Sequence, residues 1–278
     1  MADAPQAHAP WHARALGGQG GGDIQFLLLH GWGRTGESLV PLARQLAAHG
    51  HCWLPDLPGF GRTPMLAEGA GSAEYAAALL AQPVHAQARA AGRRIVVIGH
   101  SFGARVALRA AVRDPAFADA LVLIAGAGLR RRRSLPFRLR AAMLKAVGRL
   151  LKRCDRVLGT GLFARYAARV GSRDYREAGR LRATLVSVVN EDLSAVAAAV
   201  RRPTLLVYGA ADRETPPEFG RRYAALMPDA ELVILDGFGH LDILGPGAFQ
   251  CAHRILDFLA RKGLVGPAEG AGQGEGAG

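Results

Sequence analysis

A serine between two glycines is the strongest candidate nucleophile in this sequence. Gly99-His100-Ser101-Phe102-Gly103 has the G-x-S-x-G pattern, with an apolar run before it and an Ala-rich stretch after it. This context is typical of a tight turn from a buried strand into a helix, which exposes the serine hydroxyl. The helix N-terminus would direct backbone N–H groups at developing negative charge. A five-residue match is common by itself, so an ordinary strand–helix turn is the alternative.

Two residues further along the chain complete a candidate triad. A serine is a poor nucleophile until a general base removes its proton. Asp212 follows the apolar run of PTLLVYGAADRETP, and His240 follows that of AELVILDGFGHLD. Because ligands bind at the carboxyl edge of an open α/β sheet, both side chains are expected beside Ser101. The sequence thus predicts Ser101 as nucleophile, Asp212 as orienting acid and His240 as general base. Glu214 is a rival acid, and a turn-forming role is the alternative for Asp212.

The same turns supply candidate donors for an oxyanion hole, which requires two N–H groups. One is the backbone N–H of Phe102, directly after the nucleophile. The other lies in the loop that follows the strand of FLLLHGWGRTG, where the chain turns at His30-Gly31 and the N–H of Trp32 is the candidate. The Trp32 indole is expected either as an apolar wall of the site or as ordinary packing.

Short β-rich runs alternate with helical patterns through most of the chain. Such alternation predicts an α/β fold with a doubly wound, mostly parallel sheet. The strands are expected at residues 24–29, 52–54, 94–98, 120–124, 204–208 and 231–235. The helices are expected at residues 37–49, 73–91, 102–113, 217–227 and 248–261. Nearly continuous apolar runs among the strands indicate burial on both faces of the sheet.

The alternation divides the chain into four parts. Residues 23–128 and 201–262 form the predicted core, and residues 129–200, which are helical throughout, interrupt it as an insertion expected to cover one end of the sheet as a lid. Residues 1–22 are predicted to be mostly flexible, with a weak strand near residues 11–16. The low-complexity tail 263–278 is predicted to be disordered.

The insertion carries the basicity of the protein. From Leu129 to Arg202 there are nineteen Lys or Arg against five Asp or Glu, a net charge of +14, whereas the rest of the chain has −2. Residues 138–158 have the pattern of a basic amphipathic helix, preceded by the arginines 130–133. The simplest interpretation is a lid helix that packs its apolar stripe on the site. Attraction to an anionic membrane surface or anionic acyl substrate is the alternative. Nucleic acid binding is not expected, because no recognised reading motif is present.

The motifs together resemble those of the α/β-hydrolase fold family of serine hydrolases. HGWG, DLPGFGRT, GHSFG, GAADRETP and GFGH occur in the family's order, between about Ile24 and Ala260. The resemblance implies the triad Ser101, Asp212 and His240, and oxyanion donors at Trp32 and Phe102. It also implies a loop-ordering role for His30 and a structural turn at Asp56. The segment GSRDYREAGRLRATLVSVVNEDL is similar to one found in a bacterial subgroup without an assigned substrate.

These observations favour a serine esterase that cleaves a carboxylic ester or related acyl compound through an acyl-enzyme. C–C bond hydrolysis on the same triad and a non-catalytic binding protein on this fold are the alternatives. No cofactor or metal is expected. No apolar run reaches the roughly 18–20 residues of a membrane span, and MADAPQAHAPWHARA does not have the pattern of a secretory signal. Three widely spaced cysteines favour a reducing compartment, so the cytoplasm is the expected location.

Overall fold

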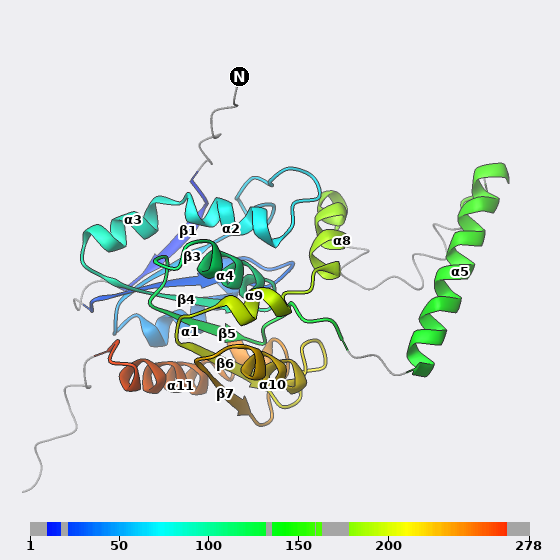
Figure 1. Ribbon diagram of the computed structural model, residues 1–278. Coiled ribbons are helices and arrows are strands. Elements are labelled where there is room, and N and C mark those ends of the chain that lie inside the picture. Colours follow the sequence, from blue (N-terminus) through cyan, green and yellow to red (C-terminus); the bar gives the residue numbers. More distant parts are fainter. Residues whose placement is uncertain (1–9, 18–21, 132–134, 159, 163–177, 266–278) are drawn as a thin grey trace, which may run out of the picture.

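A seven-stranded sheet with the order β1-β3-β2-β4-β5-β6-β7 organises the protein (Figure 1). The computed structural model describes residues 10–17, 22–131, 135–158, 160–162 and 178–265. The strands are β1 (Ala13–Leu16), β2 (Ile24–Leu29), β3 (His51–Pro55), β4 (Arg94–His100), β5 (Ala120–Ile124), β6 (Thr204–Gly209) and β7 (Ala230–Leu235). All neighbouring strands are parallel except β1, which pairs with β3 in antiparallel orientation. The predicted fold class is confirmed.

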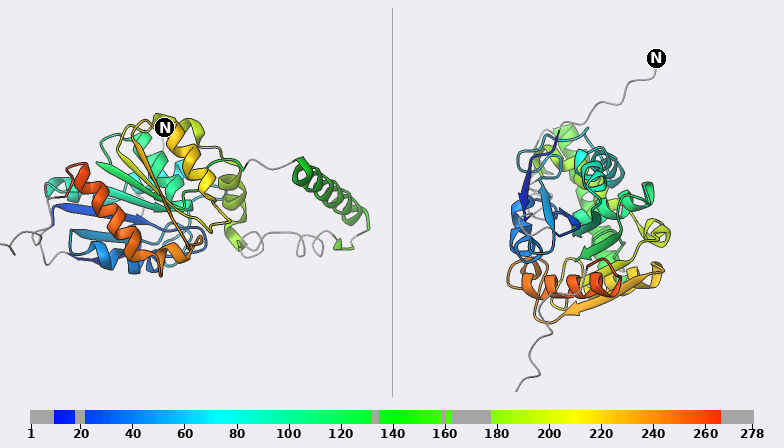
Figure 2. Two further views of the ribbon diagram at one scale, coloured as in Figure 1. Left: turned by 90° about the horizontal axis from the view of Figure 1, so that it is seen from below. Right: turned by 90° about the vertical axis from the view of Figure 1, so that its left-hand side faces the viewer.

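Helices cover both faces of the sheet (Figures 1 and 2). The helices packed with one face are α2 (Ser72–Leu80), α3 (Pro83–Ala90), α4 (Phe102–Arg113), α9 (Ser194–Ala199) and α10 (Pro217–Leu226). On the other face lie α1 (Val40–Leu46) and α11 (Ala248–Arg261). Within β2, Leu27 and Leu29 join the first core, whereas Phe26 and Leu28 join the second, because successive side chains of a strand point to opposite faces. This double burial explains the continuous apolar run of the strand.

The helix predicted at residues 73–91 is two helices in the structure. α2 ends at Leu80, and α3 begins at Pro83 after a turn in which the N–H of Gln82 donates to the carbonyl of Leu79. Proline has no N–H to continue a helix but suits its first turn. The helix predicted at residues 37–49 likewise starts as the 3-10 helix η1 (Gly36–Leu39) before α1.

The edge of the sheet near the N-terminus is formed by a short strand. The weak strand expected near residues 11–16 is present as β1, within the segment 1–22 that the sequence predicts to be mostly flexible. Trp11 is buried and stacks on Trp53, with ring centroids 6.1 Å apart, and the backbone N–H of Trp11 donates to Oε1 of Gln82. These contacts hold residues 10–17 against the core, while residues 1–9 and 18–21 lie outside the described residues. Most of the tail, residues 266–278, also lies outside them.

The insertion contains α5 (Leu135–Leu158), the 3-10 helix η2 (Gly179–Leu181), α8 (Arg182–Asn190) and α9. α8 and α9 lie on the core, but α5 stands clear of it in Figure 1 and in the left view of Figure 2. Met143 and Leu150 of its apolar stripe are each 62% exposed, and Val157 is 83% exposed. Met143, Val147 and Leu150, which belong to the apolar stripe expected to pack on the site, therefore face solvent in the described part of α5.

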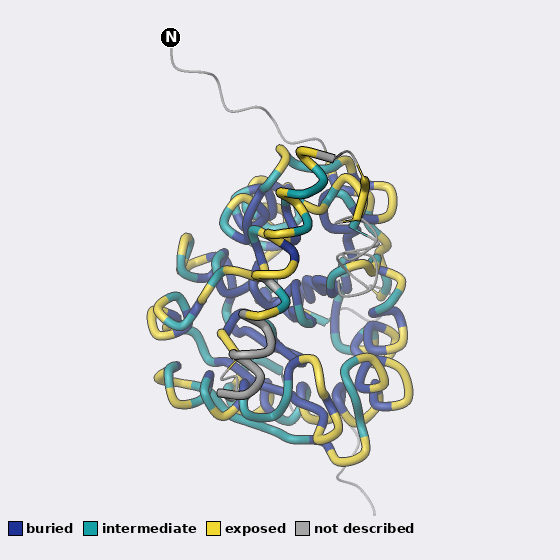
Figure 3. The backbone as a smooth tube through the Cα atoms, turned by 90° about the vertical axis from the view of Figure 1, so that its right-hand side faces the viewer, coloured by how far each residue is buried: buried dark blue, intermediate teal, exposed yellow. Residues whose placement is uncertain are grey.

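Burial is concentrated at the centre of the sheet, as Figure 3 shows from the side of the insertion. A last 3-10 helix, η3 (Asp242–Leu244), joins the loop after β7 to α11. Among the residues described, none of the helices combines the length and apolarity needed to cross a bilayer.

Candidate active site

Ser101 occupies a strained turn between β4 and α4. Its backbone has φ 50° and ψ −105°, and glycine is the residue that normally tolerates a positive φ. A Cβ at Gly99 would lie 2.6 Å from the Cα of Ala104, and one at Gly103 would lie 2.2 Å from the carbonyl oxygen of Leu29. Both glycines are therefore required by close backbone approach. The turn presents a partly exposed serine at the N-terminus of α4, as the sequence pattern predicts.

Asp212 and His240 meet at the carboxyl edge of the sheet, on the loops after β6 and β7. His240 Nδ1 lies 2.8 Å from Oδ2 of Asp212, whose carboxylate is completely buried. Burial opposes ionisation of this carboxyl, but hydrogen bonds from His240 and Thr215 outweigh it, and the pKa of Asp212 is lowered. The ionised acid accepts the Nδ1 proton of His240, which leaves Nε2 as the basic nitrogen.

Glu214, the rival acid, lies on the other side of the imidazole. Its Oε2 is 3.5 Å from Nε2 of His240, and its side chain is 68% exposed. Asp212 thus has the orienting position, while Glu214 faces the nitrogen that would accept the serine proton. Among the contacts of the described residues, no hydrogen bond joins Ser101 to His240. Such catalytic hydrogen bonds are often long in enzymes without substrate.

Thr215 is a site residue that the sequence analysis missed. Its hydroxyl lies 2.9 Å from Oδ2 of Asp212, 2.9 Å from the carbonyl oxygen of Ala125 and 3.2 Å from Nδ1 of His240. Its backbone N–H also donates to Oδ1 of Asp212. Thr215 therefore fixes the acid and links it to the end of β5. The spacing Asp-x-x-Thr, in which an aspartate caps the N–H three residues later, is the signal that points to it.

The two predicted oxyanion donors lie on adjacent turns. Phe102 is the first residue of α4, so its N–H has no acceptor within the helix. The ring centroids of Trp32 and Phe102 are 5.5 Å apart, and a Cβ at Gly31 would lie 3.4 Å from the Cβ of Ser101. The loop that carries Trp32 therefore passes directly beside the nucleophile.

Buried His30 orders that loop. The N–H of Leu57 donates to Nε2 of His30 at 2.8 Å, so the proton is on Nδ1, which donates to the carbonyl of Gly31 at 2.8 Å. Burial lowers the pKa of His30 to about 4, so the ring stays neutral near pH 7. The carboxylate of Asp56 accepts the N–H groups of Gly36 and Arg62 and so braces the neighbouring turn.

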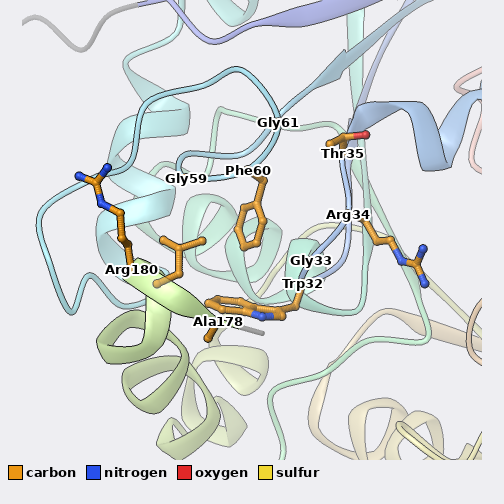
Figure 4. A pocket seen from close by; sticks show the side chains of 10 residues that line it. Trp32, Gly33, Arg34, Thr35, Gly59, Phe60, Gly61, Ala178 and Arg180 are labelled. Atoms are coloured by element: carbon orange, nitrogen blue, oxygen red, sulfur yellow. The ribbon is translucent and has the colours of Figure 1, made fainter. Parts of the chain in front are cut away.

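A pocket of about 410 Å³ opens beside Trp32 (Figure 4). Trp32 and Phe60 contribute aromatic walls, and Arg34 and Arg180 lie on opposite sides of it. Its remaining lining residues are Gly33, Thr35, Gly59, Gly61, Ala178 and Leu181. Among the described residues of the insertion, Ala178, Arg180 and Leu181 border the pocket.

The base of the insertion is tied to the acid loop. Arg131 donates to the carbonyl oxygens of Arg213 and Glu214, the latter at 2.8 Å. At the other end of the insertion, Glu191 accepts the N–H and the hydroxyl of Ser72 at 2.8 and 2.5 Å. Arg131 therefore belongs to the support of the site, although the sequence grouped it with the other basic residues of the insertion.

The described residues contain no group of three His, Cys, Asp or Glu side chains arranged to hold a metal ion. The chemistry that this edge of the sheet can perform is that of a hydroxyl nucleophile, an imidazole base oriented by a carboxylate, and N–H donors beside them.

Comparison with known proteins gives a family. Residues 26–249 match the model of the alpha/beta hydrolase family. The chain is 30% identical over 248 residues to the pimeloyl-[acyl-carrier protein] methyl ester esterase of Xanthomonas campestris pv. campestris (strain B100), covering 84% of this chain and 94% of that protein. The enzyme of the same name from Chromobacterium violaceum is 30% identical over 233 residues, which cover 78% of this chain and 87% of that one.

Solved structures support the same fold. A lipase-esterase related protein from Clostridium acetobutylicum superimposes with a TM-score of 0.67 at 18% identity, covering 90% of this chain and 100% of that one. With the family match and the esterase relatives, the mostly parallel sheet and the strained turn at Ser101 lead to one conclusion. The chain belongs to the alpha/beta hydrolase family and is an ester-cleaving serine hydrolase.

Proposed function

We propose that Ser101, Asp212 and His240 are the catalytic triad and hydrolyse a carboxylic ester through an acyl-enzyme. The observation that carries the proposal is the 2.8 Å contact between Nδ1 of His240 and the buried carboxylate of Asp212. It leaves Nε2 as the base on the same sheet edge as the strained Ser101. A binding protein that kept only the fold has no need of an ionised, buried acid on this histidine.

Acylation follows from these roles. Nε2 of His240 takes the proton of Ser101, and the serine oxygen attacks the ester carbonyl. Asp212 stabilises the imidazolium that forms, and the N–H groups of Phe102 and Trp32 stabilise the oxyanion. The imidazolium then gives its proton to the departing alcohol, and the acyl group remains on Ser101. Water, activated by His240, releases the acid by the same route and restores the serine.

The proposed substrate is the methyl ester of an acyl chain attached to a carrier protein. Relatives that are 30% identical bear the name of such an esterase. The pocket of about 410 Å³ beside Trp32 lies within the roughly 300–1,000 Å³ that small-molecule sites occupy. Its aromatic walls suit an alkyl chain. The net charge of +14 from Leu129 to Arg202 favours an anionic carrier.

The test combines a variant with a substrate panel. Wild-type enzyme should hydrolyse carrier-linked methyl esters with a higher kcat/KM than the same esters free in solution, and Ser101→Ala should hydrolyse neither. A fluorophosphonate probe should label Ser101 in the folded wild type. Equal kcat/KM for free and carrier-linked esters would remove the carrier from the proposal. Preferential cleavage of a diketone, identified by its products, would favour C–C hydrolysis instead.

A second proposal concerns the insertion, which we infer to bind anionic membrane surfaces. The exposed apolar stripe of α5 and its exposed cations Arg149, Arg153 and Arg156 support it, since interfacial helices combine these two features. Co-sedimentation with anionic and neutral vesicles tests this proposal: equal binding to both would exclude an anionic membrane as the partner of the insertion.

For location we propose the cytoplasm, supported by three cysteines that are all free.

A further inference from the structure

His100, the residue before the nucleophile, is buried but has no part in the proposed proton transfers. It is the last residue of β4 and is 1% exposed. Its ring lies between two active-site loops. The ring centroid is 4.9 Å from that of His240, and a Cβ at Gly31 would lie 2.8 Å from its Nδ1. The ring therefore fits only because residue 31 has no side chain.

One hydrogen bond connects His100 to the general base. Its Nε2 lies 3.0 Å from the backbone carbonyl oxygen of His240. A carbonyl oxygen can only accept, so Nε2 must carry the proton. Burial, together with the nearby His240, lowers the pKa of His100 to about 3, so the ring is neutral and Nδ1 has no proton. Nδ1 is buried without a partner among the described residues, in agreement with this tautomer.

We propose that His100 is a positioning residue, whose Nε2–H holds the backbone of His240 so that the imidazole of His240 is aligned with Ser101. Asp212 and Thr215 hold that imidazole at its Nδ1. His100 restrains the same residue at its backbone and is joined covalently to Ser101. The distance from nucleophile to base is thereby set within a single rigid unit. The inference rests on the proposed triad.

The experiment uses two amides that differ in reach. The side-chain amide of glutamine reaches the position of histidine Nε2, whereas that of asparagine reaches only the position of Nδ1. His100→Gln should therefore keep kcat within about threefold of wild type. His100→Asn and His100→Leu should lose roughly 10- to 100-fold in kcat, the scale expected when a catalytic group is misplaced by about 1 Å. KM should change less than about threefold in all three.

Two further measurements separate positioning from folding and from the triad itself. Thermal unfolding reports the folded fraction of each variant, and the Gln and Asn pair decides the question even where Leu does not fold. Equal kcat for Gln and Asn at equal folded fraction, or a Leu variant as fast as wild type, would overturn the inference. Ser101→Ala is the control on the triad: if it stayed active, the proposed function would fail as well, whereas an inactive Ser101→Ala beside a fast His100→Leu would overturn the inference alone.

Discussion

The core and the insertion of this protein use charge and apolar surface in opposite ways. In the core, apolar side chains are buried on both faces of the sheet, and the buried side chains of Asp212 and His30 have specific hydrogen-bond partners. In the insertion, α5 exposes cations such as Arg149 and Arg153, and it also exposes the apolar side chains of Leu150 and Val157. The proposed chemistry and the proposed recognition of a partner therefore lie in different parts of the molecule. The ends of the strands carry the residues of the proposed triad, whereas α5 is the basic helix proposed to bind a partner.

The largest effect on catalysis by the core is expected when the proposed nucleophile, Ser101, is removed. Ser101→Ala should lower kcat for activated esters by about 10⁴–10⁶, because triad members act as a unit. Circular dichroism and thermal unfolding should show an intact fold, since alanine is smaller and the turn is held by glycines. Activity within about tenfold of wild type would transfer the role of nucleophile to another residue.

The next largest effect is expected at the acid. Asp212→Asn should lower kcat by about 10⁴, because the amide favours the wrong tautomer of His240. Glu214→Gln is the matched control on the same loop. Its kcat should stay within a few-fold of wild type, because the carboxylate of Glu214 faces Nε2 of His240 and does not orient the ring at Nδ1. Steady-state kinetics on one activated ester compares the two, and the reverse order of effects would make Glu214 the orienting acid.

Acid should destabilise the core through its buried neutral histidines. The pKa values of His30 and His100 are about 4 and about 3 in the folded protein, against 6.5 in an unfolded chain. Between these values the unfolded state binds more protons, so stability is complete above pH 6.5 and falls as the pH drops toward the folded values. At pH 5, each of the two histidines should lower the free energy of unfolding by about 2 kcal/mol.

Urea unfolding of wild type and His100→Gln at pH 7 and pH 5 checks this expectation. The variant should lose less stability between the two pH values, by about the contribution of one histidine. The insertion has no histidine between residues 129 and 202, so it should not contribute through this residue type. An identical pH dependence in both proteins would contradict burial of a neutral ring at position 100.

The smallest effect on turnover is expected from the cations of α5. Replacing Arg149, Arg153 and Arg156 by Gln should change turnover of a small neutral ester by less than about twofold. Binding to anionic vesicles or carrier should weaken by up to about a hundredfold, since each cation near an anionic membrane contributes roughly 1 kcal/mol. Arg131→Gln is the contrasting variant, because its guanidinium holds the acid loop. It should reduce turnover more than the triple variant does; vesicle binding unaffected by the triple variant would remove these arginines from recognition.

The sequence by itself determined the core, its strand order in the chain and the candidate triad. β2, β5, α4 and α11 have the predicted bounds, because their apolar periodicity and flanking turns are local signals. The G-x-S-x-G pattern by itself indicates a tight turn. Gly99 is required because the chain approaches itself closely within this turn, and Gly103 is required because the turn lies against β2. Position in the sequence alone favours Asp212 over Glu214 as the acid, and the buried contact of Asp212 with His240 agrees with this prediction.

Only the tertiary structure decided the contacts between residues distant in sequence. No local pattern places Nε2 of His100 on the carbonyl of His240, 140 residues away, or Arg131 on the loop of Asp212. The position of α5 was likewise beyond the sequence, because an amphipathic stripe records that an apolar face exists but not which surface covers it. Periodicity is a property of one segment, whereas a site is made where several segments meet, and that meeting depends on the packing of the whole sheet.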